Sequence, residues 1–177
     1  MNEALILRLF EPGWPGARTA AGRYLVDGAP DASPWCALLR ADTHRVVPRD
    51  QVEPKAWDVA ILWMSKLPGA WAASGDGRLS LTGPDAAEFL LDTQRLKLAS
   101  VRLQAAKLLA SVPVRGKVTV IVDTDRHRSA LLAETKQAFD EARGDRVCAY
   151  PLEIVNGRVT GIVREPPAGQ KAWWKVW

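Results

Sequence analysis

Short apolar runs separated by turn residues predict strands in the first forty residues. Alternate apolar side chains around Arg8 predict an opening strand over residues 4–10, and the prolines and glycines of residues 11–16 end it. Similar patterns predict a second strand over residues 22–27 and a third over residues 34–40. Turn residues repeated at this spacing indicate a small meandering antiparallel sheet.

Helical spacing replaces this alternation in the middle of the chain. A proline near the start and Leu67-Pro68-Gly69 after the end favour a helix over residues 54–66. Its interior is apolar on every side, which is also typical of a buried strand, so the strand is the competing interpretation. A hairpin is expected over residues 71–82.

A long central helix is expected between Gly83 and Pro113. Apolar residues recur at helical spacing over residues 96–110, and a proline disfavours helical geometry in the residue before it. An interruption near Asp92 is the alternative, because residues 95–98 also alternate as a strand does.

The C-terminal half shows a strand, a helix and a hairpin. The β-branched run of residues 117–122 is typical of a buried central strand, and residues 129–143 have amphipathic helical spacing. Residues 146–155 and 158–163 flank Asn156-Gly157, which is a strong hairpin signal. The helical side chains expected to face inward are Leu131, Leu132, Thr135 and Phe139.

Together these elements predict an α+β protein. We expect a single mixed α/β domain over residues 1–165, with an antiparallel N-terminal sheet section, a long central helix and a C-terminal strand–helix–hairpin unit. Residues 166–177 are expected to form a basic tail joined by prolines. The composition, 47% hydrophobic and 25% charged, is ordinary for one globular domain that needs no disulfide.

Composition also excludes several classes of site. Cys36 and Cys148 form no CxxC pair, and with only two histidines in the chain no zinc or iron–sulfur spacing exists, so no cofactor is expected. No stretch is long and apolar enough for a membrane span, and the first residues lack the pattern of a signal peptide. A soluble, cytoplasmic protein is therefore expected.

The positive charge is concentrated in the second half of the chain. The formal net charge is +4, but residues 1–94 carry −3 and residues 95–177 carry +7. A basic half attracts polyanions such as nucleic acid. Arg95 and Arg102, seven positions apart, would share one helix face that could lie along a phosphate backbone, although a solvated face is the alternative.

Tryptophan is unusually frequent and closes the chain. Eight of the aromatic residues are Trp, against three Phe and two Tyr, and five of the eight are expected in the core or at its rim. The other three lie in the tail beside two lysines, which combines stacking surfaces with positive charge as single-stranded nucleic acid requires. Packing of the tail against its own domain is the alternative. The candidate binding residues of the tail are Lys171, Trp173, Trp174, Lys175 and Trp177.

A second candidate site lies where the strand over residues 117–122 meets the following helix. Asp123 and Asp125 could hold a magnesium ion beside a phosphate, and His127 could move a proton near neutral pH. Arg126 and Arg128 could neutralise phosphate oxygens. The alternative is that Asp123, Asp125 or the Thr124 between them only caps the helix.

Two family resemblances fall on these residues. The apolar run followed by acids resembles the phosphoribosyl-diphosphate motif of phosphoribosyltransferases, but residues 126–129 stand where that family has a glycine-bearing phosphate loop. The pair Asp123 and Asp125 is also similar to the second acidic motif of toprim domains, whose first motif is a glutamate that ends an earlier strand. The available upstream element ends in Met64-Ser65-Lys66 and has no such glutamate, so we treat both as coincidences of pattern.

Three functions follow from these observations. The leading interpretation is a non-enzymatic accessory protein of bacterial type, which binds nucleic acid or a nucleoprotein assembly through its basic half and tail. The first alternative is a magnesium-dependent phosphotransfer or nucleotide-processing enzyme that uses Asp123 and Asp125. The second alternative is a protein–protein interaction subunit, such as an immunity or assembly protein.

Overall fold

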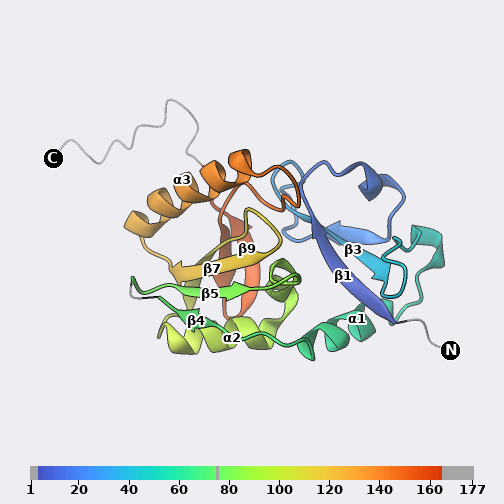
Figure 1. Ribbon diagram of the computed structural model, residues 1–177, viewed down its shortest axis with the longest axis horizontal. Helices are drawn as coiled ribbons and strands as arrows, with labels where there is room; N and C mark the ends of the chain where they lie inside the picture. Colours follow the sequence, from blue (N-terminus) through green and yellow to red (C-terminus); the bar gives the residue numbers. More distant parts are fainter. Residues whose placement is uncertain (1–3, 75, 165–177) are drawn as a thin grey trace.

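The computed structural model describes residues 4–74 and 76–164 (Figure 1). The N-terminal region forms a three-stranded antiparallel sheet of β1 (Leu5–Phe10), β3 (Trp35–Arg40) and β2 (Gly22–Tyr24), in that order. The strands and their antiparallel pairing were predicted, but the meandering order was wrong because β3 lies in the centre. Five of the six β3 residues are buried, which is the pattern of a strand covered on both faces.

The second sheet has six strands, and every neighbouring pair is antiparallel. The expected hairpin over residues 71–82 is present, and β7 is an interior strand as predicted. Asn156 and Gly157 have φ values of 52° and 76°, as a type I′ hairpin turn requires. In spatial order the strands are β4 (Ala72–Ala73), β5 (Leu79–Thr82), β7 (Lys117–Val122), β6 (Lys107–Ser111), β8 (Leu152–Val155) and β9 (Arg158–Ile162).

The long central helix is replaced by two short helices and a strand. The 3-10 helix η3 (Ala87–Leu91) leads to α2 (Thr93–Arg102), and β6 follows. The carboxylate of Asp92 starts α2 by accepting hydrogen bonds from the N–H groups of Gln94 and Arg95 at 3.0 and 3.1 Å. Gln104, with φ 51°, lies in the left-handed region just after the helix ends. The interruption near Asp92 that was the alternative is therefore present.

Two further helices complete the fold, with short 3-10 turns at Pro15–Arg18 (η1) and Arg49–Gln51 (η2). The helix predicted over residues 54–66 is α1 (Ala56–Ser65), and that predicted over residues 129–143 is α3 (Asp125–Glu141). α3 begins earlier than expected because Thr124 caps it. Its residues Leu131, Leu132 and Thr135 are buried as predicted, whereas Phe139 is only half-buried.

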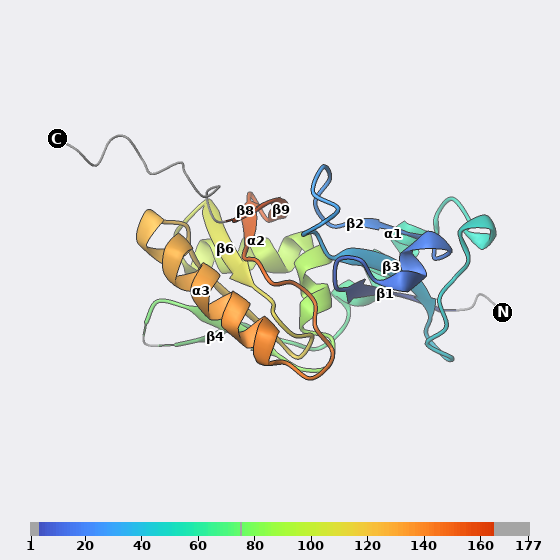
Figure 2. The same cartoon turned by 90° about the horizontal axis from the view of Figure 1, so that it is seen from above.

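The two sheets share one core. α2 and α3 lie on opposite sides of the six-stranded sheet (Figures 1 and 2), and alternate residues of β6 face each of them. Leu108 packs in the main core with Leu96 of α2, and Leu109 packs with Leu131 of α3. The main core also contains Leu7 of β1, so it runs from one sheet to the other. The α+β prediction is confirmed. None of the helices in the described ranges is long and apolar enough to span a bilayer.

Candidate binding groove at the edge of β1

The acidic corner between β7 and α3 is held together by Arg128. Its Nε and Nη2 donate to the two carboxylate oxygens of Asp123 at 2.7 and 2.6 Å, a bidentate geometry. Its Nη1 lies 2.7 Å from Glu153 Oε1. The hydrogen bond to Asp123 is the largest cause of a pKa for Arg128 well above the usual range. A metal ion would therefore compete with an ion pair that already uses both oxygens of Asp123.

The remaining residues of this corner begin α3. Thr124 Oγ1 accepts a hydrogen bond from the N–H of His127 at 3.2 Å, which is an N-cap. His127 Nδ1 lies 2.8 Å from the carbonyl oxygen of Val122. Asp125 lies in the first turn, where a carboxylate suits the helix dipole, and both it and Arg126 are exposed. Among the described residues no three His, Cys, Asp or Glu side chains are grouped to hold a metal ion.

Arg95 and Arg102 contact the protein's own backbone. Arg95 donates to the carbonyl oxygens of Leu67 and Gly69 at 2.9 and 2.8 Å, and its guanidinium lies 3.8 Å from the centre of the Phe89 ring. Arg102 donates to the carbonyl oxygen of Trp71. Both arginines therefore anchor the segment between α1 and β4.

The remaining candidates from the sequence lie in the tail. Lys171, Trp173, Trp174, Lys175 and Trp177 lie outside the described residues. Cys36 and Cys148 are buried free thiols, and burial raises the pKa of each to about 12. Thiols with such a pKa are not nucleophilic at neutral pH, so neither cysteine is a candidate for catalysis.

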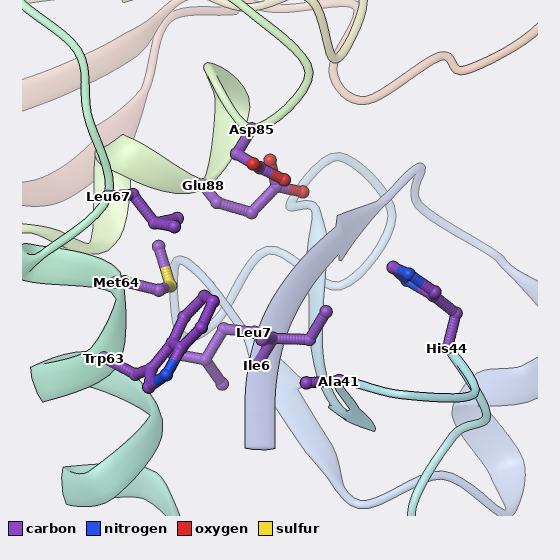
Figure 3. A pocket seen from close by; sticks show the side chains of 9 residues that line it. All are labelled: Ile6, Leu7, Ala41, His44, Trp63, Met64, Leu67, Asp85 and Glu88. Atoms are coloured by element: carbon purple, nitrogen blue, oxygen red, sulfur yellow. The ribbon is translucent and has the colours of Figure 1, made fainter. Parts of the chain in front are cut away.

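A groove of about 250 Å³ runs along the outer edge of β1 (Figure 3). On one side α1 supplies Trp63 and Met64, the turn after α1 supplies Leu67, and the side chain of Leu7 extends toward this wall. The three side chains of this wall are apolar. Trp63 is the exposed one of the three, with an exposed fraction of 41%. This side of the groove offers an aromatic and aliphatic surface.

The opposite wall and one end of the groove are more polar. Ile6, Ala41 and His44 line the side away from α1. The carboxyl groups of Asp85 and Glu88 lie together at one end, where Arg8 Nη1 contacts Asp85 at 3.1 Å and Arg8 Nε lies 3.9 Å from Glu88. The groove therefore has an apolar wall beside α1 and two carboxyl groups at one end.

The backbone of β1 presents hydrogen-bonding groups on this edge. Ala41 N–H donates to the carbonyl oxygen of Ala4 at 2.8 Å, so alternate residues from Ala4 onward bond to β3. The N–H and C=O groups of Leu5, Leu7 and Leu9 consequently point to the opposite, outer edge. At Leu9 that edge is already occupied, because Leu9 N–H donates to Glu88 Oε1 at 3.2 Å and Arg115 Nη2 donates to Leu9 C=O at 2.9 Å.

One carboxylate oxygen of Glu88 has no hydrogen-bond donor among the described residues. The residue is 1% exposed, and its Oε1 also accepts from Arg115 Nη1, whereas its Oε2 is buried with no hydrogen-bond partner in the described part of the chain. Burial is the main cause of a raised pKa at this carboxyl, against the opposing effect of Arg115. Buried carboxylate oxygens in folded proteins normally have a donor, so this oxygen is an exception that needs an explanation.

The outward side of α1 extends the apolar wall beyond the groove. Val59, Leu62 and Trp63 are 52%, 60% and 41% exposed and stand at i, i+3 and i+4, which places them on one helix face. Trp63 was expected in the core or at its rim, and the structure places it at the mouth of the groove. The sequence signal was present, because a helix that is apolar on every side and lies at the surface must expose one apolar face.

Comparison with known proteins finds no matching family model, no similar curated protein and no similar solved structure.

Proposed function

We propose that the protein is a protein–protein interaction subunit that binds an extended segment of a partner protein along the outer edge of β1. The observation that carries this proposal is the groove of about 250 Å³ lying on that edge, beside the outward N–H and C=O groups of Leu7. An extended segment added to a sheet edge gains affinity from main-chain hydrogen bonds and specificity from side-chain pockets. The groove supplies both kinds of contact.

The exposed apolar face of α1 supports the same proposal. A partner that follows β1 would also cover Trp63 and Leu62, which otherwise remain in water. Partly exposed aromatic residues beside a groove are typical of the central contacts of protein interfaces. The α2 helix provides an internal comparison. It also exposes apolar side chains, Leu98 and Val101, but none of its residues lines the groove.

The experiment is a selection from a phage-displayed library of random dodecapeptides, followed by measured affinities of the selected peptides. Ala41→Trp should fill the groove, and Trp63→Ala should remove its aromatic wall, so each should weaken binding at least tenfold. Val101→Ala removes an exposed apolar side chain from α2 and is the matched control, with binding expected within about twofold of wild type. If the selection yields no peptide whose binding is weakened by both Ala41→Trp and Trp63→Ala, the proposal is overturned.

Hydrogen exchange gives an independent test of the binding mode. A bound strand should protect the amides of Leu5 and Leu7, which face the open edge. The amides of Ile6 and Arg8 are already bonded to β3 and should change little. Protection that spares Leu5 and Leu7 would show that the peptide does not pair with β1.

Binding of nucleic acid stays a prediction. It rests on the +7 charge of residues 95–177 and on the tail, and the guanidinium groups of Arg95, Arg102 and Arg128 are engaged within the protein. Short single-stranded DNA and RNA should bind with an affinity that falls steeply as salt is raised. Binding that is absent at low salt, or unchanged by salt, would contradict it.

A further inference from the structure

One end of the groove is closed to a continuing strand. Glu88 and Arg115 contact the N–H and C=O of Leu9 as a neighbouring strand would, so an added strand cannot pair past Leu7 in that direction. A partner segment must therefore either turn away or end there. A chain terminus fits this closure without a turn.

The groups at the closed end select which terminus fits. Glu88 and Asp85 line the groove there, and both are hydrogen-bond acceptors. The basic groups nearby are already committed, because Arg8 contacts Asp85 and Arg115 contacts Glu88. The buried Oε2 of Glu88 has no donor within the described ranges. An α-ammonium group supplies the hydrogen-bond donors that these acceptors lack, whereas a terminal carboxylate would add only further acceptors.

We propose that the groove receives the free N-terminus of the partner chain, which runs antiparallel to β1 and places its α-ammonium group beside Glu88 and Asp85. This rests on the proposed function, since it assigns a chemistry to the same groove. Antiparallel pairing follows from the geometry, because only that direction brings an N-terminus to the Leu9 end of β1. The ammonium donates hydrogen bonds to Glu88 Oε2 and shares Asp85 with Arg8.

The register also defines the second residue of the partner. Because Leu9 is occupied, the first residue lies opposite Arg8 and the second lies opposite Leu7. Side chains of directly opposed residues share one face of a sheet. The second side chain therefore enters the apolar wall formed by Trp63, Met64 and Leu67, and an aliphatic residue is expected at that position.

Two matched phage libraries test the proposal. In one library the random dodecapeptide begins at a free N-terminus, and in the other it lies behind a fixed Gly-Ser-Gly-Ser segment. We expect binders that depend on Trp63 only from the first library. A synthetic peptide from it should lose at least tenfold in affinity when its N-terminus is acetylated, because the ammonium group is replaced by an amide. It should lose a similar factor when two glycines are added in front.

The outcomes separate this inference from the proposed function. Equal enrichment from both libraries, with the same dependence on Trp63 and Ala41, would overturn capture of an N-terminus and leave binding at the edge of β1 intact. The failure of both libraries would overturn the proposed function itself. Acetylation that changes the affinity less than twofold would also contradict the inference.

Variants of the acidic end provide the last arm. Asp85→Asn should reduce the preference for the free over the acetylated peptide to less than about threefold, and Glu88→Gln should have the same effect. Glu134→Gln is the matched control, because Glu134 is an exposed carboxylate paired with Arg78 and does not line the groove. Asp85 is partly exposed, so its variant should fold and decides the question even if Glu88→Gln does not.

Discussion

Two acid–arginine pairs in this molecule have opposite consequences. At the start of α3, Asp123 and Arg128 are five residues apart and partly exposed, and both carboxylate oxygens are hydrogen-bonded. At the edge of β1, Glu88 and Arg115 are remote in sequence and almost completely buried, and one oxygen of Glu88 has no partner among the residues described. The fold therefore uses the hydrogen-bonding capacity of one acid completely and leaves part of that of the other unused.

The energetic settings of the pairs differ in the same way. A buried ion pair loses its hydration on folding, so removing one partner leaves an uncompensated charge. The Arg128 side chain is 36% exposed, so solvent screens its pair with Asp123 more than the buried pair and the loss of Arg128 costs less. Substitutions in the two pairs should therefore differ in their loss of unfolding free energy by several kcal/mol.

Arg115→Met should be the most destabilising substitution. It leaves Glu88 buried without its main partner and removes the donor to the carbonyl oxygen of Leu9. Breaking a buried pair typically costs about 3–5 kcal/mol of unfolding free energy. Urea denaturation followed by circular dichroism measures the loss. Arg128→Met is the matched substitution in the other pair, and it should lose about 1 kcal/mol of unfolding free energy or less. A loss below about 1 kcal/mol for Arg115→Met would contradict the stabilising role of the buried pair.

The pH dependence of stability should report Glu88. Its folded pKa is raised above the ordinary value of 4.5, so the folded state binds more protons than the unfolded state just above that pH. The Glu88 contribution is therefore fully present below pH 4.5 and is lost as the pH rises through the folded pKa, by at most about 1.4 kcal/mol for each pH unit. The charged groups facing Glu88 are Arg8, Arg115 and Asp85.

The measurement compares wild type with Glu88→Gln between pH 4.5 and pH 7. Wild type should lose stability relative to the variant as the pH rises. Carboxyl groups whose pKa is lowered by their partners, such as Glu134 beside Arg78, have the opposite dependence but are present in both proteins and cancel in the difference. A difference that is constant, or that grows in favour of wild type, would contradict a raised pKa at Glu88.

The sequence predicted local elements better than it predicted the site. Strands such as β7 and the Asn156-Gly157 hairpin follow from patterns of a few residues, and these predictions are confirmed. The helix expected up to Ala110 was wrong because its apolar stripe also suits a strand buried on both faces, as β6 is. Helical and strand periodicity cannot be distinguished over so short an apolar run.

The groove could not be predicted because it is assembled from distant segments. Its residues come from β1, from the turn after β3, from α1 and the turn after it, and from η3 and the turn before it, and no two of these segments share a sequence motif. Pairing of Glu88 with Arg115 depends on both sheets meeting, which local patterns do not encode. The apolar circumference of α1 was the one available signal, but the same pattern is typical of a buried element and did not by itself indicate an exposed face.

Thr124→Ala tests whether the corner between β7 and α3 is a helix start. Loss of the hydroxyl removes the acceptor for the N–H of His127, and an N-cap of this kind contributes about 1 kcal/mol. Urea denaturation should show a loss of that size. Thr124→Ser retains the hydroxyl and is the control, expected within about 0.5 kcal/mol of wild type. Equal stability of the Thr124→Ala and Thr124→Ser variants would show that the Thr124 hydroxyl does not stabilise the start of α3.

Arg128→Ala should have the smallest effect on stability and should decide between an ion pair and a metal site. The guanidinium is about one-third exposed, so solvent screening limits the loss to about 1 kcal/mol or less. The substitution frees both oxygens of Asp123, while Glu153 remains on the neighbouring strand β8.

If Asp123 and Asp125 form a magnesium site that Arg128 blocks, millimolar Mg²⁺ should raise the melting temperature of this variant, and Asp123→Ala should abolish the rise. We expect no change in melting temperature with Mg²⁺ for either wild type or Arg128→Ala, because the described residues supply no third ligand group there. A magnesium-dependent rise that requires Asp123 would restore the enzymatic alternative and would remove the contrast between the two acid–arginine pairs.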